Sequence, residues 1–421
     1  MRSGGWAPPR WLSTRAVLLA ALAILAGSAR PASGATPNGA ASSAAATRVV
    51  RPNIADVTYH GGPVQHSSAV YAIFWAPAPF SFPANYQAVV SQYFTDVAHD
   101  SYLATNVYAN PTQYYDTNGN ARRYASYNVA FKAAIIETRA FPASGCTNYV
   151  IGDSSVSKVC LTDTQIQKEI ASVISSHHLP RGLSTNYFLF TPQGVASCKT
   201  ANGLSSGGCY NPLQFNGHCA YHSHIGSGGN AVLYAHMAYD ALAGCTSLQS
   251  PNGNAADAVL NNVSHEHNEM ITDPLGTGWY DSSNGDEISD KCHQTFGVPM
   301  GATATGQYNQ IINGHGYYLQ QGWSNRAGAC VQRNSFPQPI VSFTFKPATP
   351  VHGKKITFVS SVKESGESSF AYRWSFPDNG ASSAKNPTHT FASAVFAGNV
   401  TLVITDSHGS QTRMVKAITV M

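Results

Sequence analysis

The sequence predicts an α+β protein of two domains, a layered main domain of mixed strands and helices followed by a small all-β sandwich. Three observations favour this class. Apolar β-type runs alternate with helical patterns over residues 56–334, and short period-two runs fill residues 335–421. The 421 residues also exceed what one hydrophobic core usually supports. We expect the boundary at the Pro-punctuated stretch 334–339.

The N-terminal residues 1–35 have the features of a signal peptide. Arginines without any acid precede an apolar run over 16–26, and small residues follow at Ser33–Ala35, where a signal peptidase needs them. The run has about half of the roughly 20 residues that a membrane-spanning helix needs. We therefore expect a secreted, extracellular protein with no membrane span in the mature chain. Residues 36–55 have few large apolar side chains and are expected to form a disordered leader.

Charged residues make up only 11% of the chain, compared with roughly 25% in average soluble proteins. The net charge of +4 is spread out, without a cluster of Lys and Arg. This distribution argues against a nucleic-acid partner.

The eight cysteines all fall in the main domain and point to disulfide bonds. An even number in an exported chain is typical of disulfides, although eight cysteines permit 105 pairings. A zinc–thiolate site is disfavoured because no C-x-x-C pair is present. We expect neighbours along the chain to pair, which gives Cys146–Cys160, Cys198–Cys209, Cys219–Cys245 and Cys292–Cys330.

The elements of the main domain follow from periodicity and capping residues. Apolar β-type runs predict strands over 69–75, 129–136 and 187–190. Helical spacing predicts helices over 84–98, 163–177 and 255–272, the second opened by Thr162 or Asp163 as its N-cap. These elements indicate a layered α/β core.

The helix over 255–272 carries the residues that point to chemistry. At 100° per residue its apolar side chains share one face, while His265 and Glu269 lie together on the other, with Glu266 at the flank. The resulting H-E-x-x-E sequence is related to the H-E-x-x-H motif of zincins, in which two ligands one turn apart hold zinc. We therefore predict a zincin-like main domain, with zinc on His265 and Glu269. Glu266 would be the catalytic base that takes a proton from water. The helix should end near Thr272, because Pro274 disfavours a helical conformation at the residue before it.

A third zinc ligand must come from outside this helix. Glu287 and Asp290 are candidates that a Cys292 disulfide would hold in place, and His222 in the histidine-rich loop 217–224 is another. His267 falls near the apolar face and is expected to be a hydrogen-bonded core histidine. The alternative is that this segment is an ordinary surface helix whose polar side chains face the solvent and bind no metal.

Three segments resemble the EXORDIUM/phosphate-induced protein family, known in plants, and its exported bacterial relatives. They are Tyr59–Pro63 with the following strand, Cys219–His222, and 264–292 with its Ser-His-Glu and Thr-Asp-Pro sequences. The resemblance implies an EXORDIUM-like secreted domain over residues 56–334, tied to the cell wall and growth. It implies no particular reaction.

Two functions of different classes therefore stay open. The first is a zinc-dependent metallohydrolase of the peptidase type, and the second is a non-enzymatic protein that binds an extracellular protein or a cell-wall polysaccharide. Serine hydrolase, phosphate-binding and dinucleotide-binding motifs are absent from the sequence. Glycoside hydrolysis stays possible if four carboxylates converge: Glu266, Glu269, Asp281 and Glu287.

The C-terminal domain shows alternating strands separated by polar turns, which predict a small sandwich. Its expected strands are 341–345, 355–359, 370–376, 400–404 and 414–420. The segments Tyr372–Phe376, Asn386–Phe391 and Val400–Gly409 resemble a PKD domain, and the turn Pro377–Gly380 departs from the family's tighter Gly-Asp-Gly turn. The resemblance implies an immunoglobulin-like spacer or weak binding module without catalysis.

Overall fold

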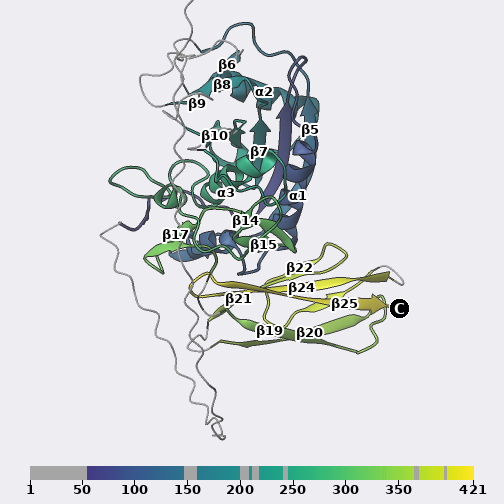
Figure 1. Ribbon diagram of the computed structural model, residues 1–421. Helices are drawn as coiled ribbons and strands as arrows, with labels where there is room; N and C mark the ends of the chain where they lie inside the picture. Colours follow the sequence, from purple (N-terminus) through teal and green to yellow (C-terminus); the bar gives the residue numbers. More distant parts are fainter. Residues whose placement is uncertain are drawn as a thin grey trace, which may run out of the picture. The chain divides into compact units, whose positions relative to one another are not determined.

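A five-stranded sheet forms the centre of the main domain, with the strand order β10-β11-β7-β2-β5 (Figure 1). Four strands are parallel, and β10 runs antiparallel to β11 at one edge. Their bounds are β2 Ser68–Trp75, β5 Val129–Glu137, β7 Thr185–Phe190, β10 Ala220–Ile225 and β11 Val232–Met237. All residues of β7 and β11 are buried, as expected for parallel strands covered on both faces.

Helices cover both faces of this sheet. The helices α1 (Tyr86–His99) and α3 (Ala256–Thr272) pack on one face, where Phe94 and Val263 join the core that contains Phe74. The helix α2 (Asp163–Ser176) packs on the other face, where Ile170 meets the core that contains Ile73. The domain is thus a layered α/β structure.

The three predicted helices are confirmed within two residues at each end. In α2 the hydroxyl of Thr162 accepts a hydrogen bond from the Gln165 amide, and the Gln165 side chain accepts one from the Thr162 amide, which forms a capping box. The helix α3 ends at Thr272, as the following Pro274 requires.

The structure, a computed structural model, describes residues 55–146, 159–199, 208–210, 218–239, 245–334, 336, 338–364, 369–392 and 396–421. The predicted signal peptide and all but the last residue of the predicted leader lie outside the described residues. Within this part of the chain, no helix is long and apolar enough to cross a membrane.

Short strands and 3-10 turns complete the main domain. The 3-10 turns are η1 Val107–Gln113, η3 Gly228–Asn230 and η4 Asp290–Cys292. The strands are β1 Thr58–Tyr59, β3 Tyr115–Asn118, β4 Ala121–Tyr124, β6 Val159–Thr162, β8 Val195–Cys198, β9 Cys209–Tyr210, β12 Trp279–Tyr280, β13 Gly301–Ala302, β14 Gln307–Tyr308, β15 Gln310–Ile312, β16 His315–Tyr317, β17 Gly322–Ser324 and β18 Ala329–Val331.

The C-terminal segment forms the predicted sandwich from two antiparallel sheets, ordered β19-β20-β23 and β22-β21-β24-β25. Side chains alternate between buried and exposed along β20, and a core with Phe343, Phe358 and Trp374 fills the space between the sheets. The bounds are β19 Ile340–Lys346, β20 Lys355–Lys363, β21 Phe370–Ser375, β22 Ala381–Ser382, β23 Thr388–Thr390, β24 Phe396–Asp406 and β25 Gln411–Val420.

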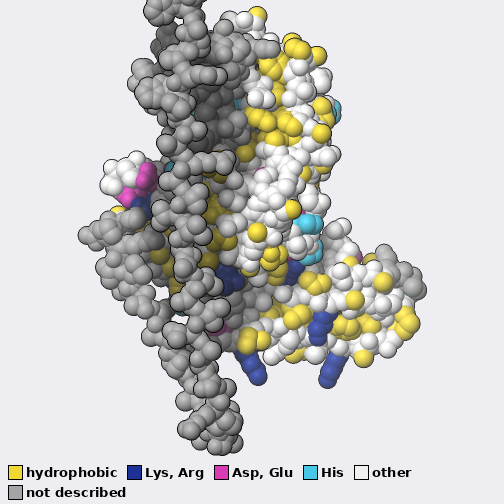
Figure 2. All heavy atoms as spheres, viewed as in Figure 1, with side chains coloured by type: hydrophobic (Ala, Val, Ile, Leu, Met, Phe, Trp, Pro, Cys, Tyr) yellow, Lys and Arg dark blue, Asp and Glu magenta, His cyan; other side chains and the backbone are white. Residues whose placement is uncertain are grey.

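The four predicted disulfides are all present. They join Cys146 to Cys160, Cys198 to Cys209, Cys219 to Cys245, and Cys292 to Cys330. The second half of the main domain has many short strands and turns. The cross-links stabilise it by restricting the unfolded chain, and they do so more for longer loops. Few Lys, Arg, Asp or Glu side chains appear among the described residues on the face shown in Figure 2, as the composition leads us to expect.

The helix α3 is not the solvated surface helix of the alternative interpretation. Fifteen of its seventeen residues are buried, because the segment around Asp290 and the loop at Gln320 cover its polar face. His267 is fully buried and contacts the Ser68 hydroxyl at 2.7 Å and the Tyr108 hydroxyl at 3.2 Å. The prediction of a hydrogen-bonded core histidine is therefore confirmed.

Candidate metal centre

A cavity of about 340 Å³ lies beside the polar face of α3 and collects the six residues that the sequence singled out. Its described lining comes from α3, from β10 with the residues before it, from the segment 287–293, and from Lys199, which follows β8. The lining residues are Lys199, His218, Cys219, Ala220, Tyr221, His222, Asn262, His265, Glu266, Glu269, Glu287, Asp290 and His293.

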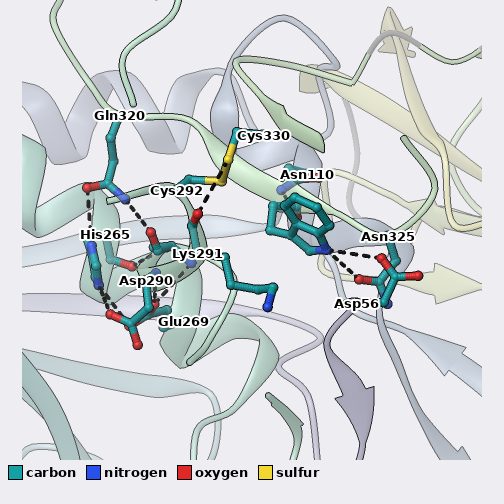
Figure 3. The surroundings of a disulfide bond; sticks show 12 residues. Asp56, Asn110, His265, Glu269, Asp290, Lys291, Cys292, Gln320, Asn325 and Cys330 are labelled. Atoms are coloured by element: carbon teal, nitrogen blue, oxygen red, sulfur yellow. Dashed lines mark hydrogen bonds and ion pairs between the residues drawn. A yellow bond between two sulfur atoms is a disulfide. The ribbon is translucent and has the colours of Figure 1, made fainter. Parts of the chain in front are cut away.

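The first group of donors surrounds His265 (Figure 3). Its Nε2 atom lies 3.2 Å from Glu269 Oε2 and 3.2 Å from Asp290 Oδ1. The backbone amides of Ser289 and Asp290 donate to Glu269 Oε1 at 3.1 and 3.0 Å, which leaves Oε2 directed at the histidine. On the far side of the ring, Gln320 Oε1 lies 3.3 Å from His265 Nδ1. The arrangement fixes both the imidazole and the carboxylate.

The second group of donors is centred on His222. Its Nε2 atom lies 2.9 Å from Glu287 Oε2 and 3.7 Å from Glu269 Oε2. His222 belongs to the edge strand β10 instead of the expected loop, because the segment pairs with β11 and Cys219 at its start is bonded to Cys245. The other oxygen of Glu287, Oε1, is buried without a hydrogen-bond partner.

Burial and mutual charge shift the protonation equilibria of this cluster. Burial raises the pKa of Glu266 to about 7 and that of Glu269 to about 7, although the charge on His265 opposes both shifts. Burial also raises the pKa of Glu287 well above its usual range. For His265, burial alone would lower the pKa, but Glu269 and Asp290 outweigh it and raise the pKa well above 6.5. The six residues thus combine four carboxylates and two imidazoles in one cavity.

The donor set fits a zinc ion. Nitrogen and oxygen ligands at about 2.0–2.1 Å from a tetrahedral zinc lie about 3.3 Å from one another. The two contacts of His265 match that spacing, and the donor atoms of His265, Glu269 and Asp290 all lie within 4.8 Å of one another. The donor atoms of His222, Glu266 and Glu269 meet the same limit.

Asp281, which the sequence suggested as a site carboxylate, has another role, and the sequence did not indicate Gln320 as a neighbour of His265. Asp281 does not join the other carboxylates, because Oδ2 accepts a hydrogen bond from Lys291 at 2.6 Å and Ser283 donates to Oδ1. The four carboxylates considered for glycoside hydrolysis therefore do not all line the cavity. Gln320 was missed because it lies 55 residues from His265 and no local motif marks it.

The glycine pair after His60 has a structural explanation. Strand β1 pairs with β12, and the amide of Gly62 donates to the Thr277 carbonyl at 2.6 Å. A Cβ atom on Gly62 would lie 2.2 Å from Thr277 Oγ1 and 2.4 Å from the Thr277 carbonyl oxygen. Only glycine permits this approach, which anchors the turn that follows α3.

Fold and site together define a disulfide-rich α/β protein with a histidine–carboxylate cavity and a C-terminal β-sandwich. Residues 337–420 match the sequence profile of the PKD domain, so the C-terminal segment is a PKD domain. Over 110 residues the chain is 31% identical to Protein EXORDIUM-like 3 of Arabidopsis thaliana. The match covers 22% of this chain and 32% of that protein, so the chain spans about a third of the length of its curated relative.

Two solved structures are similar to 20% of this chain. One comes from a study of carbohydrate-binding modules of the beta-sandwich superfamily, with 25% identity, a TM-score of 0.19 and 34% of that chain covered. The other is the PKD1 domain from the Vibrio cholerae metalloprotease PrtV, with 24% identity, a TM-score of 0.18 and 96% of that chain covered.

Proposed function

We propose that the main domain is a secreted, zincin-like metallohydrolase of the peptidase type. The observation that carries the proposal is the contact of His265 Nε2 with Glu269 and Asp290, both at 3.2 Å, beside Glu266 in one cavity. Two ligands one helical turn apart, a third from a following loop and an adjacent free carboxylate are what zinc-assisted hydrolysis requires.

His265, Glu269 and Asp290 would hold the zinc ion, with Glu287 and His222 as the other candidates for the third ligand. When bound, zinc supplies a Lewis acid that polarises a carbonyl group and makes water more acidic. Glu266 lies one residue after His265 and lines the same cavity, so its carboxylate can accept the proton of the attacking water and pass it to the leaving amine. The backbone amides of Ser289 and Asp290 keep Glu269 in its binding orientation.

The setting of this activity is proposed to be extracellular. Four disulfides are typical of proteins in oxidising compartments. The PKD domain would then act as a spacer, or as a module that binds an extracellular protein or a cell-wall polysaccharide. If the cavity holds no metal, the alternative function is that the whole chain binds an extracellular protein or a cell-wall polysaccharide without catalysis.

Metal content separates these two functions. Protein purified without chelator should contain zinc by mass spectrometry, and His265→Ala should lose it. His177→Ala, which changes an exposed histidine at the end of α2, should keep it. No metal in the wild-type protein would contradict the hydrolase.

A second variant tests the catalytic base. Glu266→Gln should keep the metal and abolish cleavage of a fluorogenic peptide library, because the amide cannot accept a proton. Cleavage at the wild-type rate would exclude Glu266 as the base.

A further inference from the structure

We propose that the cavity binds two divalent metal ions that share Glu269. The inference rests on the proposed function and deepens it, because it assigns a second metal to the same site. The first ion would lie between His265, Asp290 and Glu269, and the second between His222, Glu287 and Glu269.

The number of donors exceeds what one zinc ion uses. A catalytic zinc takes three protein ligands and leaves one position open. The described lining of the cavity includes four histidines and four carboxylates, and two of these histidines, His222 and His265, approach Glu269 Oε2. After His265, Glu269 and Asp290 bind one ion and Glu266 serves as the base, a second donor pair is left over. That pair is His222 and Glu287, whose donor atoms lie 2.9 Å apart.

The contacts form two groups around one oxygen atom. Both imidazoles approach Glu269 Oε2, His265 at 3.2 Å and His222 at 3.7 Å. Each imidazole also contacts one carboxylate of its own, Asp290 at 3.2 Å and Glu287 at 2.9 Å. Since two backbone amides occupy Glu269 Oε1, its Oε2 atom is the one free to bridge. Paired ions in hydrolases lie about 3.5–4 Å apart, a separation that one bridging oxygen can span.

An unpaired buried oxygen and the local charge point to the second ion independently. Glu287 Oε1 is buried in the structure without a hydrogen-bond partner, and buried polar oxygens are otherwise satisfied by donors or metals. Among the described lining residues, Lys199 is the one Lys or Arg side chain beside four carboxylates. Four carboxylates beside one lysine and one divalent ion would leave one negative charge unbalanced, and a second divalent ion would offset it.

The paired site accounts for the hydrolytic step. One ion would orient the carbonyl of the peptide bond while the other orients the attacking water, so that both oxygens are stabilised. A C–O bond forms, the C–N bond breaks, and Glu266 carries the proton from water to the leaving amine. Imidazole and carboxylate donors in each half suit Zn²⁺, which is therefore the probe.

Zinc stoichiometry tests the inference without an activity assay. Chelator-treated protein is titrated with Zn²⁺ by calorimetry, and bound zinc is then counted by mass spectrometry after gel filtration. The wild-type chain and the His177→Ala control should bind two ions. His222→Ala and Glu287→Gln should each bind one, and circular dichroism checks that they are folded.

The outcomes separate this inference from the proposed function. A wild-type stoichiometry of one, lost in His265→Ala, overturns the second ion and keeps the hydrolase. Two ions in both Glu287→Gln and His222→Ala overturn it as well, because the second ion would then lie elsewhere. No zinc in the wild-type chain overturns both proposals. If His222→Ala fails to fold, the isosteric Glu287→Gln decides alone.

Discussion

Replacing Cys292 and Cys330 by alanine is expected to lower the free energy of unfolding by about 4 kcal/mol and to weaken zinc binding. The bond closes a loop with a sequence separation of 38. The chain-entropy relation for a loop of that length gives about 13 cal/mol/K, or about 4 kcal/mol at 25 °C. The affinity for zinc should fall because Cys292 lies two residues after Asp290 (Figure 3). Both the backbone amide and the carboxylate of Asp290 belong to the proposed site.

A matched pair of variants separates stability from binding. Cys146 and Cys160 close a loop with a separation of 14 and line no part of the cavity, so their replacement should cost about 3 kcal/mol. Urea unfolding gives the stabilities and Zn²⁺ titration the affinities. We expect both double variants to be destabilised, and only the Cys292/Cys330 variant to lose about 10–100-fold in zinc affinity. Equal zinc affinity in both variants would refute the reasoning.

Two further predictions concern buried polar groups that are not among the proposed metal ligands. Burial lowers the pKa of His236 to about 4, against the opposing charge of Asp163, while the unfolded chain titrates near pH 6.5. His236 by itself should therefore contribute about 2 kcal/mol less to the free energy of unfolding at pH 5 than at pH 8. His236→Gln should remove this contribution and change the pH dependence of urea unfolding by that amount; an unchanged pH dependence would contradict it. Ser68→Ala should cost about 1–3 kcal/mol, because the buried His267 loses its 2.7 Å partner. The exposed Ser175→Ala should change stability by less than about 0.5 kcal/mol, and equal effects of the two variants would exclude this role.

The elements that could be predicted from the sequence are those with local signals. The capping residues Thr162 and Gln165 fix the start of α2, and Pro274 fixes the end of α3. The disulfide pairing followed from sequence proximity, since each cysteine bonds to the next one along the chain. The i,i+4 spacing of His265 and Glu269 also placed them together on one helix face, where they lie 3.2 Å apart.

The features that the sequence did not predict depend on contacts between segments that are distant along the chain. The sequence of β10 does not indicate a strand, because its histidines and serine show no alternation of apolar and polar residues. The segment is a strand because it pairs with β11. The burial of the polar face of α3 comes from Gln320 and from the segment around Asp290, neither of which has a local motif. For the same reason, Glu287, Asp290 and His222 could be named as candidates but not ranked.

Anomalous diffraction at the zinc absorption edge tests the metal centre most directly. Crystals grown with Zn²⁺ should show a peak about 2.0–2.2 Å from His265 Nε2 and Glu269 Oε2, with Asp290 or another of the cavity donors completing the ligands. The same peak should be absent in His265→Ala crystals. A wild-type crystal with zinc only at the surface, and no peak in this cavity, would contradict the account.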